Sequence, residues 1–168
     1  KISREIKKEN KNKPYDCLIG LSGGVDSSYV AYWVKKLGLR ALAVHVDNGW
    51  NSELSVANIE KIVKKLNIEL HTEVLDWTEF RDLQRSFFLA SVPNCEIPTD
   101  HAIVATLLRL SVKFGIKYIL SGSNLTTEGI YQKISTDNKD SVNIKSIHKL
   151  FGTVKLQKYP YLNIYNFA

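Results

Sequence analysis

The sequence predicts an α/β protein built on a parallel sheet with helices on both faces. Three observations predict it. Short apolar runs alternate with longer amphipathic segments, the first two runs are apolar at almost every position, and a glycine-rich turn joins the first run to the first helix. Continuous apolar runs are typical of parallel strands buried on both faces. Strands alternating with helical segments indicate βαβ units.

We expect four strands and the helices between them. The strands lie at 17–21, 41–46, 69–75 and 118–120, and the helices at about 25–37, 52–66, 78–90 and 99–115. Gly38 ends the first helix, Ser52 caps the second, and Thr99 or Asp100 caps the fourth. Right-handed crossovers then give a Rossmann-like strand order of 3-2-1-4, which a fifth strand could extend. Further along, Ile144, Ile147 and Leu150 indicate one more helical turn.

Composition limits the class of protein. The 168 residues suit one domain, and 44% hydrophobic with 24% charged residues is typical of a soluble globular protein. No apolar run approaches the ~20 residues that a membrane helix needs. Cys17 and Cys95 form no CxxC pair, which excludes a structural zinc site made from this chain alone and gives no reason to expect a disulfide. We therefore expect a cytoplasmic protein with no membrane contact.

The net charge of +6 lies at the two ends of the chain, and residues 14–138 carry a net charge of −2. The centre is therefore not a basic platform for nucleic acid. We divide the chain into a basic N-terminal segment (1–14), a nucleotide-binding domain (15–130) and a C-terminal extension (131–168) that we expect to be truncated. Tyrosines in this extension suggest that it docks onto something, for example another domain.

Residues 22–28, SGGVDSS, follow the first strand and open the first helix. Glycines let the backbone turn tightly and bring N–H groups close to a ligand. The free N–H groups and dipole of a helix N-terminus favour an anion, and serine hydroxyls add donors. We interpret the segment as a phosphate cradle; the alternative is a plain glycine-rich turn. It is neither a Walker A loop, since Gly-Lys-Ser/Thr is missing, nor a GxGxxG fingerprint.

SGGVDSS resembles the signature of the PP-loop, or N-type, ATP pyrophosphatases, whose fold is adenine nucleotide alpha hydrolase-like. The resemblance implies an enzyme that cleaves ATP to AMP and pyrophosphate after a substrate oxygen attacks the α-phosphorus. It implies ATP and Mg²⁺ as cofactors, with Asp26 as a catalytic, magnesium-associated acid; the alternative for Asp26 is a helix N-terminal carboxylate. The implied phosphate-binding residues are Ser22, Gly23, Gly24, Asp26, Ser27 and Ser28.

Two further positions fall where a nucleotide pocket requires them, because ligands of open α/β sheets bind beyond the carboxyl ends of the strands. The resemblance implies that the backbone of Val46, at the end of the second strand, reads adenine. It also implies that Gly122, after the fourth strand, lets the ribose approach. The alternative for both is ordinary strand and turn.

Four longer segments are more specific than the loop. Together they resemble the N-acetyl sugar amidotransferases of bacterial surface-polysaccharide (lipopolysaccharide) biosynthesis, over most of residues 15–162. The segments are 45–52 (HVDNGWNS), 92–102 (VPNCEIPTDHA), 121–129 (SGSNLTTEG) and 144–148 (IKSIH). The resemblance implies adenylation of the acylamino oxygen of a nucleotide-linked sugar, and replacement of that oxygen by nitrogen from ammonia that a partner glutaminase supplies.

Within these segments the resemblance gives Asp100 and His101 a role in orienting substrate. It makes Glu128 a catalytic acid, either a second magnesium ligand or a group facing the sugar. Each has a structural alternative: Asp100 as a helix cap, His101 as a first-turn residue and Glu128 as a surface acid. Lys145 and His148 are expected to face solvent. For Trp50 and Trp77, packing is favoured over a sugar platform, although Trp50 lies beside the expected pocket.

Two other classes remain open. A tRNA-modifying PP-loop enzyme, of thiolase or lysidine synthetase type, would bind RNA, and Cys95 could then carry sulfur. The neutral-to-acidic centre and the lack of paired cysteines count against this class, so nucleic acid is not expected as a partner. A non-catalytic nucleotide sensor like the universal stress proteins would share the architecture, but their phosphate loops lack SGGxDSS.

Overall fold

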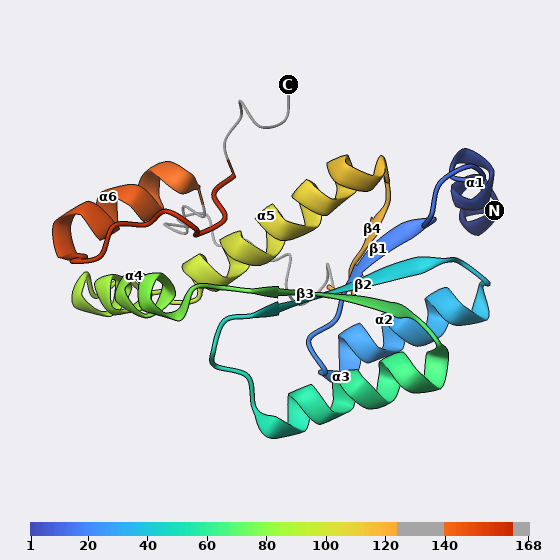
Figure 1. Ribbon diagram of the computed structural model, residues 1–168, viewed down its shortest axis with the longest axis horizontal. Helices are drawn as coiled ribbons and strands as arrows, with labels where there is room; N and C mark the ends of the chain where they lie inside the picture. The colour runs from blue at the N-terminus through green and yellow to red at the C-terminus, as the bar shows by residue number, and fades with distance from the viewer. Residues whose placement is uncertain (124–139, 163–168) are drawn as a thin grey trace.

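The computed structural model describes residues 1–123 and 140–162. In these ranges the chain forms four strands and six helices (Figure 1). The strands are β1 (Cys17–Gly20), β2 (Ala41–Asp47), β3 (Glu69–Val74) and β4 (Ile119–Leu120). The helices are α1 (Ile2–Glu9), α2 (Val25–Lys36), α3 (Glu53–Leu66), α4 (Trp77–Leu89), α5 (Ile97–Phe114) and α6 (Ser141–Phe151). No helix in these ranges is both long enough and apolar enough to cross a membrane.

The strands form one parallel sheet in the order β3-β2-β1-β4, which confirms the predicted order. The register places Leu18 of β1 beside Leu42 of β2 on one side and Ile119 of β4 on the other. From β1 the chain crosses to β2 and β3 on one side, and it then returns to β4 on the other side of β1. The point where the strand order reverses, the switch point, therefore lies between β1 and β4. The fifth strand considered from the sequence is not among the described residues.

Side chains of β1 alternate between two helix layers. Cys17 and Ile19 belong to a core with α2 and α3, whereas Leu18 belongs to a core with α5. In Figure 1, α2 and α3 lie on one side of the sheet and α5 on the other. All three side chains are fully buried, and burying one Leu or Ile side chain contributes about 2 kcal/mol. Because β1 buries side chains on both of its faces, its continuous apolar run is explained by a central position in the sheet.

Helix ends follow the sequence in two cases and depart from it in a third. Ser52 caps α3 by accepting a hydrogen bond from the Ser55 N–H at 3.1 Å, as predicted, and Gly38 follows α2 with a φ of 64°. The predicted cap of α5 at Thr99 or Asp100 is wrong. The helix begins at Ile97, and no side chain caps it. Pro98 lies in the first turn, where its missing N–H costs nothing.

The C-terminal part of the described chain packs against α4 and α5. Helix α6 has 11 residues, more than the single turn that was expected, and Ile144 on it is fully buried. Residues 153–162, here called the C-terminal strap, then bring Tyr159 and Tyr161 into the cluster formed by Phe80, Phe87 and Ile97. The expected docking surface of these tyrosines is therefore on this chain's own helices. Figure 1 shows α4 and α6 side by side beyond the ends of the strands.

Candidate functional site

The loop between β1 and α2 has a backbone that only glycine can adopt at one position. Gly23 has a φ of 78°, and a Cβ there would collide with the backbone carbonyl of Ser55 on α3. The Gly23 carbonyl in turn accepts a hydrogen bond from the Asn58 side chain at 3.1 Å. The loop is thus held against α3, and its fixed path brings α2 to begin at Val25.

Hydroxyl groups of the loop pair with one another and with its backbone. The Ser22 and Ser27 hydroxyls are 3.1 Å apart, and the Ser22 N–H donates to Ser27 Oγ at 3.2 Å. Ser27 and Ser28 both donate to the Gly24 carbonyl, at 3.1 and 2.6 Å. Ser22 and Ser27 line the neighbouring cavity and Ser28 does not. The first two hydroxyls are therefore placed to meet a ligand, whereas Ser28 shapes the loop.

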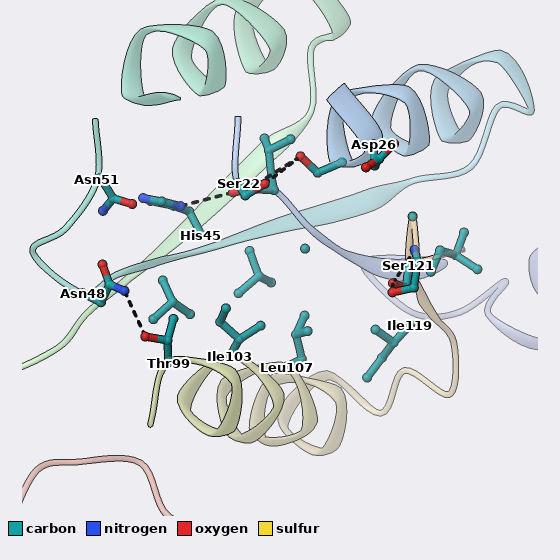
Figure 2. Close-up of a pocket in the computed structure, with 18 residues that line it drawn as sticks. Ser22, Asp26, His45, Asn48, Asn51, Thr99, Ile103, Leu107, Ile119 and Ser121 are labelled. Atoms are coloured by element: carbon teal, nitrogen blue, oxygen red, sulfur yellow. Dashed lines mark hydrogen bonds between the residues drawn. The ribbon is translucent and has the colours of Figure 1, made fainter. Parts of the chain in front are cut away.

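The cavity lies beyond the carboxyl ends of β1, β2 and β4 and has a volume of about 480 Å³. One part is polar and is formed by Ser22, Ser27 and the exposed carboxylate of Asp26. The opposite wall is apolar and comes mainly from α5, as Figure 2 shows for Ile103 and Leu107. Val44, Val46, Ile119 and Leu120 add further apolar surface. A polar corner facing an apolar wall suits a ligand with a charged end and a flat apolar end.

Gly122 brings the turn after β4 close to the start of α2. A Cβ at Gly122 would lie 3.0 Å from the backbone oxygen of Asp26, so any larger residue would push the two segments apart. On either side of it, the hydroxyls of Ser121 and Ser123 are 2.7 Å apart, and both line the cavity. The structure thus places Val46 and Gly122 on the cavity with Ser22, Ser27 and Asp26.

Four further polar residues line the cavity and were not predicted as site residues: His45, Asn48, Asn51 and Thr99. Asn48 donates to the Thr99 hydroxyl at 3.3 Å, which ties the end of β2 to the first turn of α5 (Figure 2). Asn51 donates to the Asp47 carboxylate at 2.8 Å. The signal that could have found Asn48 and Asn51 is their position directly after β2, at the edge where parallel strands end together.

Of the remaining predicted site residues, the two that the structure describes, Asp100 and His101, are not brought to the cavity. Glu128 lies outside the described residues. Asp100 is in the first turn of α5 next to Thr99, but it is not among the lining residues. His101 is buried, its Nε2 accepts a hydrogen bond from the Leu162 N–H at 2.9 Å, and its ring stacks on Tyr159. His101 therefore anchors the C-terminal strap in this structure.

Two residues of α6, Lys145 and His148, were expected to face solvent. His148 donates from Nε2 to the Val154 carbonyl at 2.7 Å, and its Nδ1 lies 3.2 Å from the Ser86 hydroxyl. The Lys145 ammonium lies over the Tyr161 ring, 4.6 Å from its centre. Both side chains thus contact other parts of the fold. Lys145 is nevertheless exposed, as expected, so the expectation failed for His148 alone, whose partner Ser86 lies 62 positions away in the sequence.

The cavity's residues fit a magnesium nucleotide. Mg²⁺ usually takes one or two carboxylates together with substrate phosphates and water, and needs no cage of protein ligands. Asp26 supplies one carboxylate beside Ser22 and Ser27. Among the described residues no three His, Cys, Asp or Glu side chains gather into a metal site. A metal at this corner would therefore be held jointly by Asp26 and by the phosphates of the ligand.

Comparison with known proteins adds to this geometry. The family described as "Queuosine biosynthesis protein QueC" matches residues 16–131. The tRNA-specific 2-thiouridylase MnmA of Helicobacter hepaticus is 30% identical over 83% of this chain and 39% of its own length. The glutamine-hydrolyzing GMP synthase of Thermosipho africanus is 29% identical over 80% of this chain and 26% of its own length.

Among solved structures, the glutamine-dependent NAD⁺ synthetase of Acinetobacter baumannii shares the fold, with a TM-score of 0.56 and 22% identity. That match covers 74% of this chain and 24% of the synthetase. The chain spans about two fifths of the curated 2-thiouridylases that it matches, and less of the GMP synthase.

Proposed function

Since this chain belongs to the QueC family within the PP-loop ATP-using enzymes, we propose that it binds ATP–Mg²⁺ and adenylates a substrate oxygen with release of pyrophosphate. The observation that carries the proposal is the junction of β1 and α2. There a loop held in place by Gly23 presents Ser22, Ser27 and Asp26 to one cavity at a helix N-terminus. This is the chemistry required to hold a leaving pyrophosphate.

Each part of the cavity has a role in this reaction. The loop N–H groups and the Ser22 and Ser27 hydroxyls hold the β- and γ-phosphates, whose charge rises as the bond to the α-phosphorus breaks. Asp26 orients Mg²⁺, which neutralises part of that charge when it is bound. In this proposal adenine lies between α5 and β2, next to the backbone of Val46, and the ribose lies over Gly122; the apolar side chains that both elements bring to the cavity support this arrangement.

For the substrate we propose the oxygen of an acylamino group on a sugar. The amide oxygen attacks the α-phosphorus and pyrophosphate leaves. Ammonia then adds to the activated carbon, AMP leaves with the former amide oxygen, and an amidino group remains. Two observations support this choice: the four sequence segments that resemble sugar amidotransferases, and a cavity to which the described residues bring serine, threonine and asparagine side chains but no Lys or Arg. The glutamine-hydrolyzing relative supports ammonia from a glutaminase partner.

A second candidate is tRNA modification, and the names of the curated relatives favour it over the sugar substrate. Several tRNA-specific 2-thiouridylases match most of this chain at 26–30% identity. Sulfur transfer through this chain's own thiols would need Cys95. Cys17 is buried in β1, where burial and the nearby Asp16 raise the pKa of its thiol to about 12. A thiol with that pKa has almost no nucleophilic thiolate at neutral pH.

One assay separates the candidates. The complete protein is incubated with ATP, Mg²⁺ and ammonia, together with either a panel of nucleotide-linked acylamino sugars or a tRNA pool, and AMP and pyrophosphate are measured. If the acceptor is a sugar, AMP formation should depend on the sugar. The product should be about one mass unit lighter than the starting sugar, because O is exchanged for NH. AMP formation that depends on tRNA alone would establish the second candidate. No AMP with any acceptor would refute adenylation itself.

A further inference from the structure

Two tryptophans stand exposed on the segments that follow β2 and β3. Trp50 follows β2 and is 60% exposed, and Trp77 opens α4 after β3 and is 43% exposed. Their rings make a T-shaped contact with centres 5.4 Å apart. Tryptophan is usually well buried, because exposing its large apolar surface to water is unfavourable. Two adjoining exposed indoles at the edge of the sheet where ligands bind therefore need an explanation other than core packing.

The segment that carries Trp50 is held in one conformation. The Gly49 N–H donates to the Asp47 carboxylate and the Trp50 N–H donates to the Asn48 side chain, each at 3.0 Å. Gly49 has a φ of 80°, and a Cβ there would lie 2.6 Å from the Trp77 ring. The backbone of Gly49 thus lies directly on Trp77, which fixes the loop against α4. A ring displayed on a fixed loop loses little conformational entropy when it binds a ligand.

In the sequence, Trp50 lies between two residues of the cavity wall, Asn48 and Asn51. Asn48 and Asn51 both line the cavity, and Asn48 is tied to Thr99 across it. All three present neutral amide or hydroxyl groups, which suit hydroxyls and an acylamino group better than phosphates. An acceptor that reacts at the α-phosphorus must enter the same cavity as ATP. Trp50 is not itself a lining residue, but its backbone N–H is bonded to the Asn48 side chain, so its exposed ring is carried by the loop that supplies Asn48 and Asn51 to the cavity wall.

We propose that Trp50, supported by Trp77, is the platform on which the sugar ring of the acceptor stacks, with Asn48 and Asn51 hydrogen bonding its polar substituents. This rests on the proposed function, since it names how the same site takes an acylamino sugar. The apolar C–H face of a pyranose lies flat on an indole ring. The neutral polar groups beside Trp50 then select for the substituents of the ring.

The test is steady-state kinetics of the complete protein with Trp50→Ala and Trp50→Phe. The probes are UDP-N-acetylglucosamine, UDP-N-acetylgalactosamine and their deoxy analogues. We expect Trp50→Ala to raise the KM for the sugar by about tenfold, the loss of one ring contact of about 1.4 kcal/mol. Trp50→Phe should recover part of that loss. The KM for ATP should stay within about twofold, because Trp50 is not among the residues that line the cavity.

Trp33→Ala is the matched control, since Trp33 is an exposed tryptophan on α2 that contacts Tyr29 and Tyr32 instead. It should leave the sugar KM unchanged. An unchanged sugar KM in Trp50→Ala, with sugar-dependent turnover in the wild type, overturns the platform and leaves the proposed function standing. A wild type that no sugar stimulates removes the proposed function and the platform with it. Weaker tRNA binding by Trp50→Ala in a filter assay, with sugar kinetics unchanged, would assign the platform to RNA.

Discussion

The loop between β1 and α2 and the contact between α4 and the C-terminal strap both gather polar groups around a helix, but those groups face a cavity in the first and are buried in the second. In the loop, Asp26 and Ser22 are exposed and face a cavity. On α4, Glu79 and Asp82 are only 6% and 7% exposed. Asp82 accepts hydrogen bonds from the Thr153 N–H at 2.7 Å, the Thr153 hydroxyl at 2.9 Å and the Val154 N–H at 2.9 Å.

Glu79 is the second buried carboxylate in the contact between α4 and the C-terminal strap. It accepts hydrogen bonds from the backbone N–H groups of Lys158 and Tyr159, at 2.9 and 3.0 Å. Carboxylates buried in this way are stabilised by donors of the same chain and have little capacity left for a ligand. The loop groups are open to a cavity and can exchange their contacts for those of a phosphate. Carboxylates with satisfied partners thus hold the fold, and carboxylates that face the cavity are the ones available for chemistry.

The largest effect should come from Asp82→Ala. It leaves the N–H groups of Thr153 and Val154 without their acceptor in a buried setting, so we expect the free energy of unfolding to fall by about 3 kcal/mol. Urea denaturation of residues 1–168 followed by circular dichroism measures this. Asp26→Ala is the matched control and should cost less than about 0.5 kcal/mol, because Asp26 is exposed. Equal losses in the two variants would contradict the comparison.

Asp26→Asn should affect catalysis strongly and stability little, the opposite of Asp82→Ala. We expect the rate of pyrophosphate release by the complete protein to fall by about 100-fold, while the Kd for ATP rises by no more than about threefold. The reason is that a carboxylate which steers Mg²⁺ matters most when charge moves onto pyrophosphate. Stopped-flow pyrophosphate detection and isothermal titration with ATP–Mg²⁺ give the two numbers. Similar losses in rate and in affinity would make Asp26 a structural residue.

Gly23→Ala should weaken ATP binding by about tenfold. The left-handed φ costs an alanine about 1–2 kcal/mol, and its Cβ would push the loop away from Ser55. Gly38→Ala is the matched control, because Gly38 also has a positive φ of 64° but lies at the other end of α2. Both variants should lose stability, and only Gly23→Ala should lose affinity in isothermal titration. If Gly23→Ala and Gly38→Ala bound ATP with equal affinity, the loop would not be the part of the protein that holds the phosphates.

Acid should weaken the α4–strap contact. Burial by itself raises the pKa of Asp82, but the hydrogen bonds from Val154 and Thr153 outweigh it and the pKa lies below its ordinary value. A lowered folded-state pKa stabilises the fold above the unfolded pKa of about 3.9, and this stabilisation is lost as the pH falls through the folded pKa. The stability gap between wild type and Asp82→Ala should therefore shrink below about pH 4.

Urea midpoints at a series of pH values would measure this gap. His148 and Arg85 also face Asp82, at 3.8 and 3.9 Å. His148→Gln in both proteins removes the titration of the imidazole from the comparison. A gap that stays constant down to pH 2 would mean that the contribution of Asp82 to stability does not depend on its ionisation, which contradicts the lowered pKa.

The same comparison explains what the sequence could predict. The sheet order and the loop depend on local signals: apolar runs such as 17–21 and a seven-residue motif at a strand–helix junction. The hydrogen bonds from the strap to Asp82 and Glu79 join residues that are 71 to 80 positions apart, so no local pattern distinguishes Asp82 from Asp26. The position of Asn48 opposite Thr99 likewise depends on how two distant elements pack.

The smallest effect is expected for Cys95→Ser. Cys95 is half-buried, and its thiol is not among the groups that line the cavity. Its backbone carbonyl accepts a hydrogen bond from the Gln84 side chain at 2.5 Å, which fixes the loop before α5 through the main chain and not through sulfur. Serine keeps that main-chain contact and is close in size to cysteine. We therefore expect the rate of ATP-dependent product formation by the complete protein to stay within about twofold.

Cys17→Ser is the matched control, since it introduces a hydroxyl into the fully buried interior of β1. It should lower the free energy of unfolding by about 1–3 kcal/mol without a specific loss of activity in the folded protein. A carrier thiol would behave differently, because sulfur transfer cannot proceed through a serine hydroxyl. If Cys95→Ser abolished product formation while folding and ATP binding stayed intact, sulfur transfer to tRNA would replace amidation of a sugar as the function of this cavity.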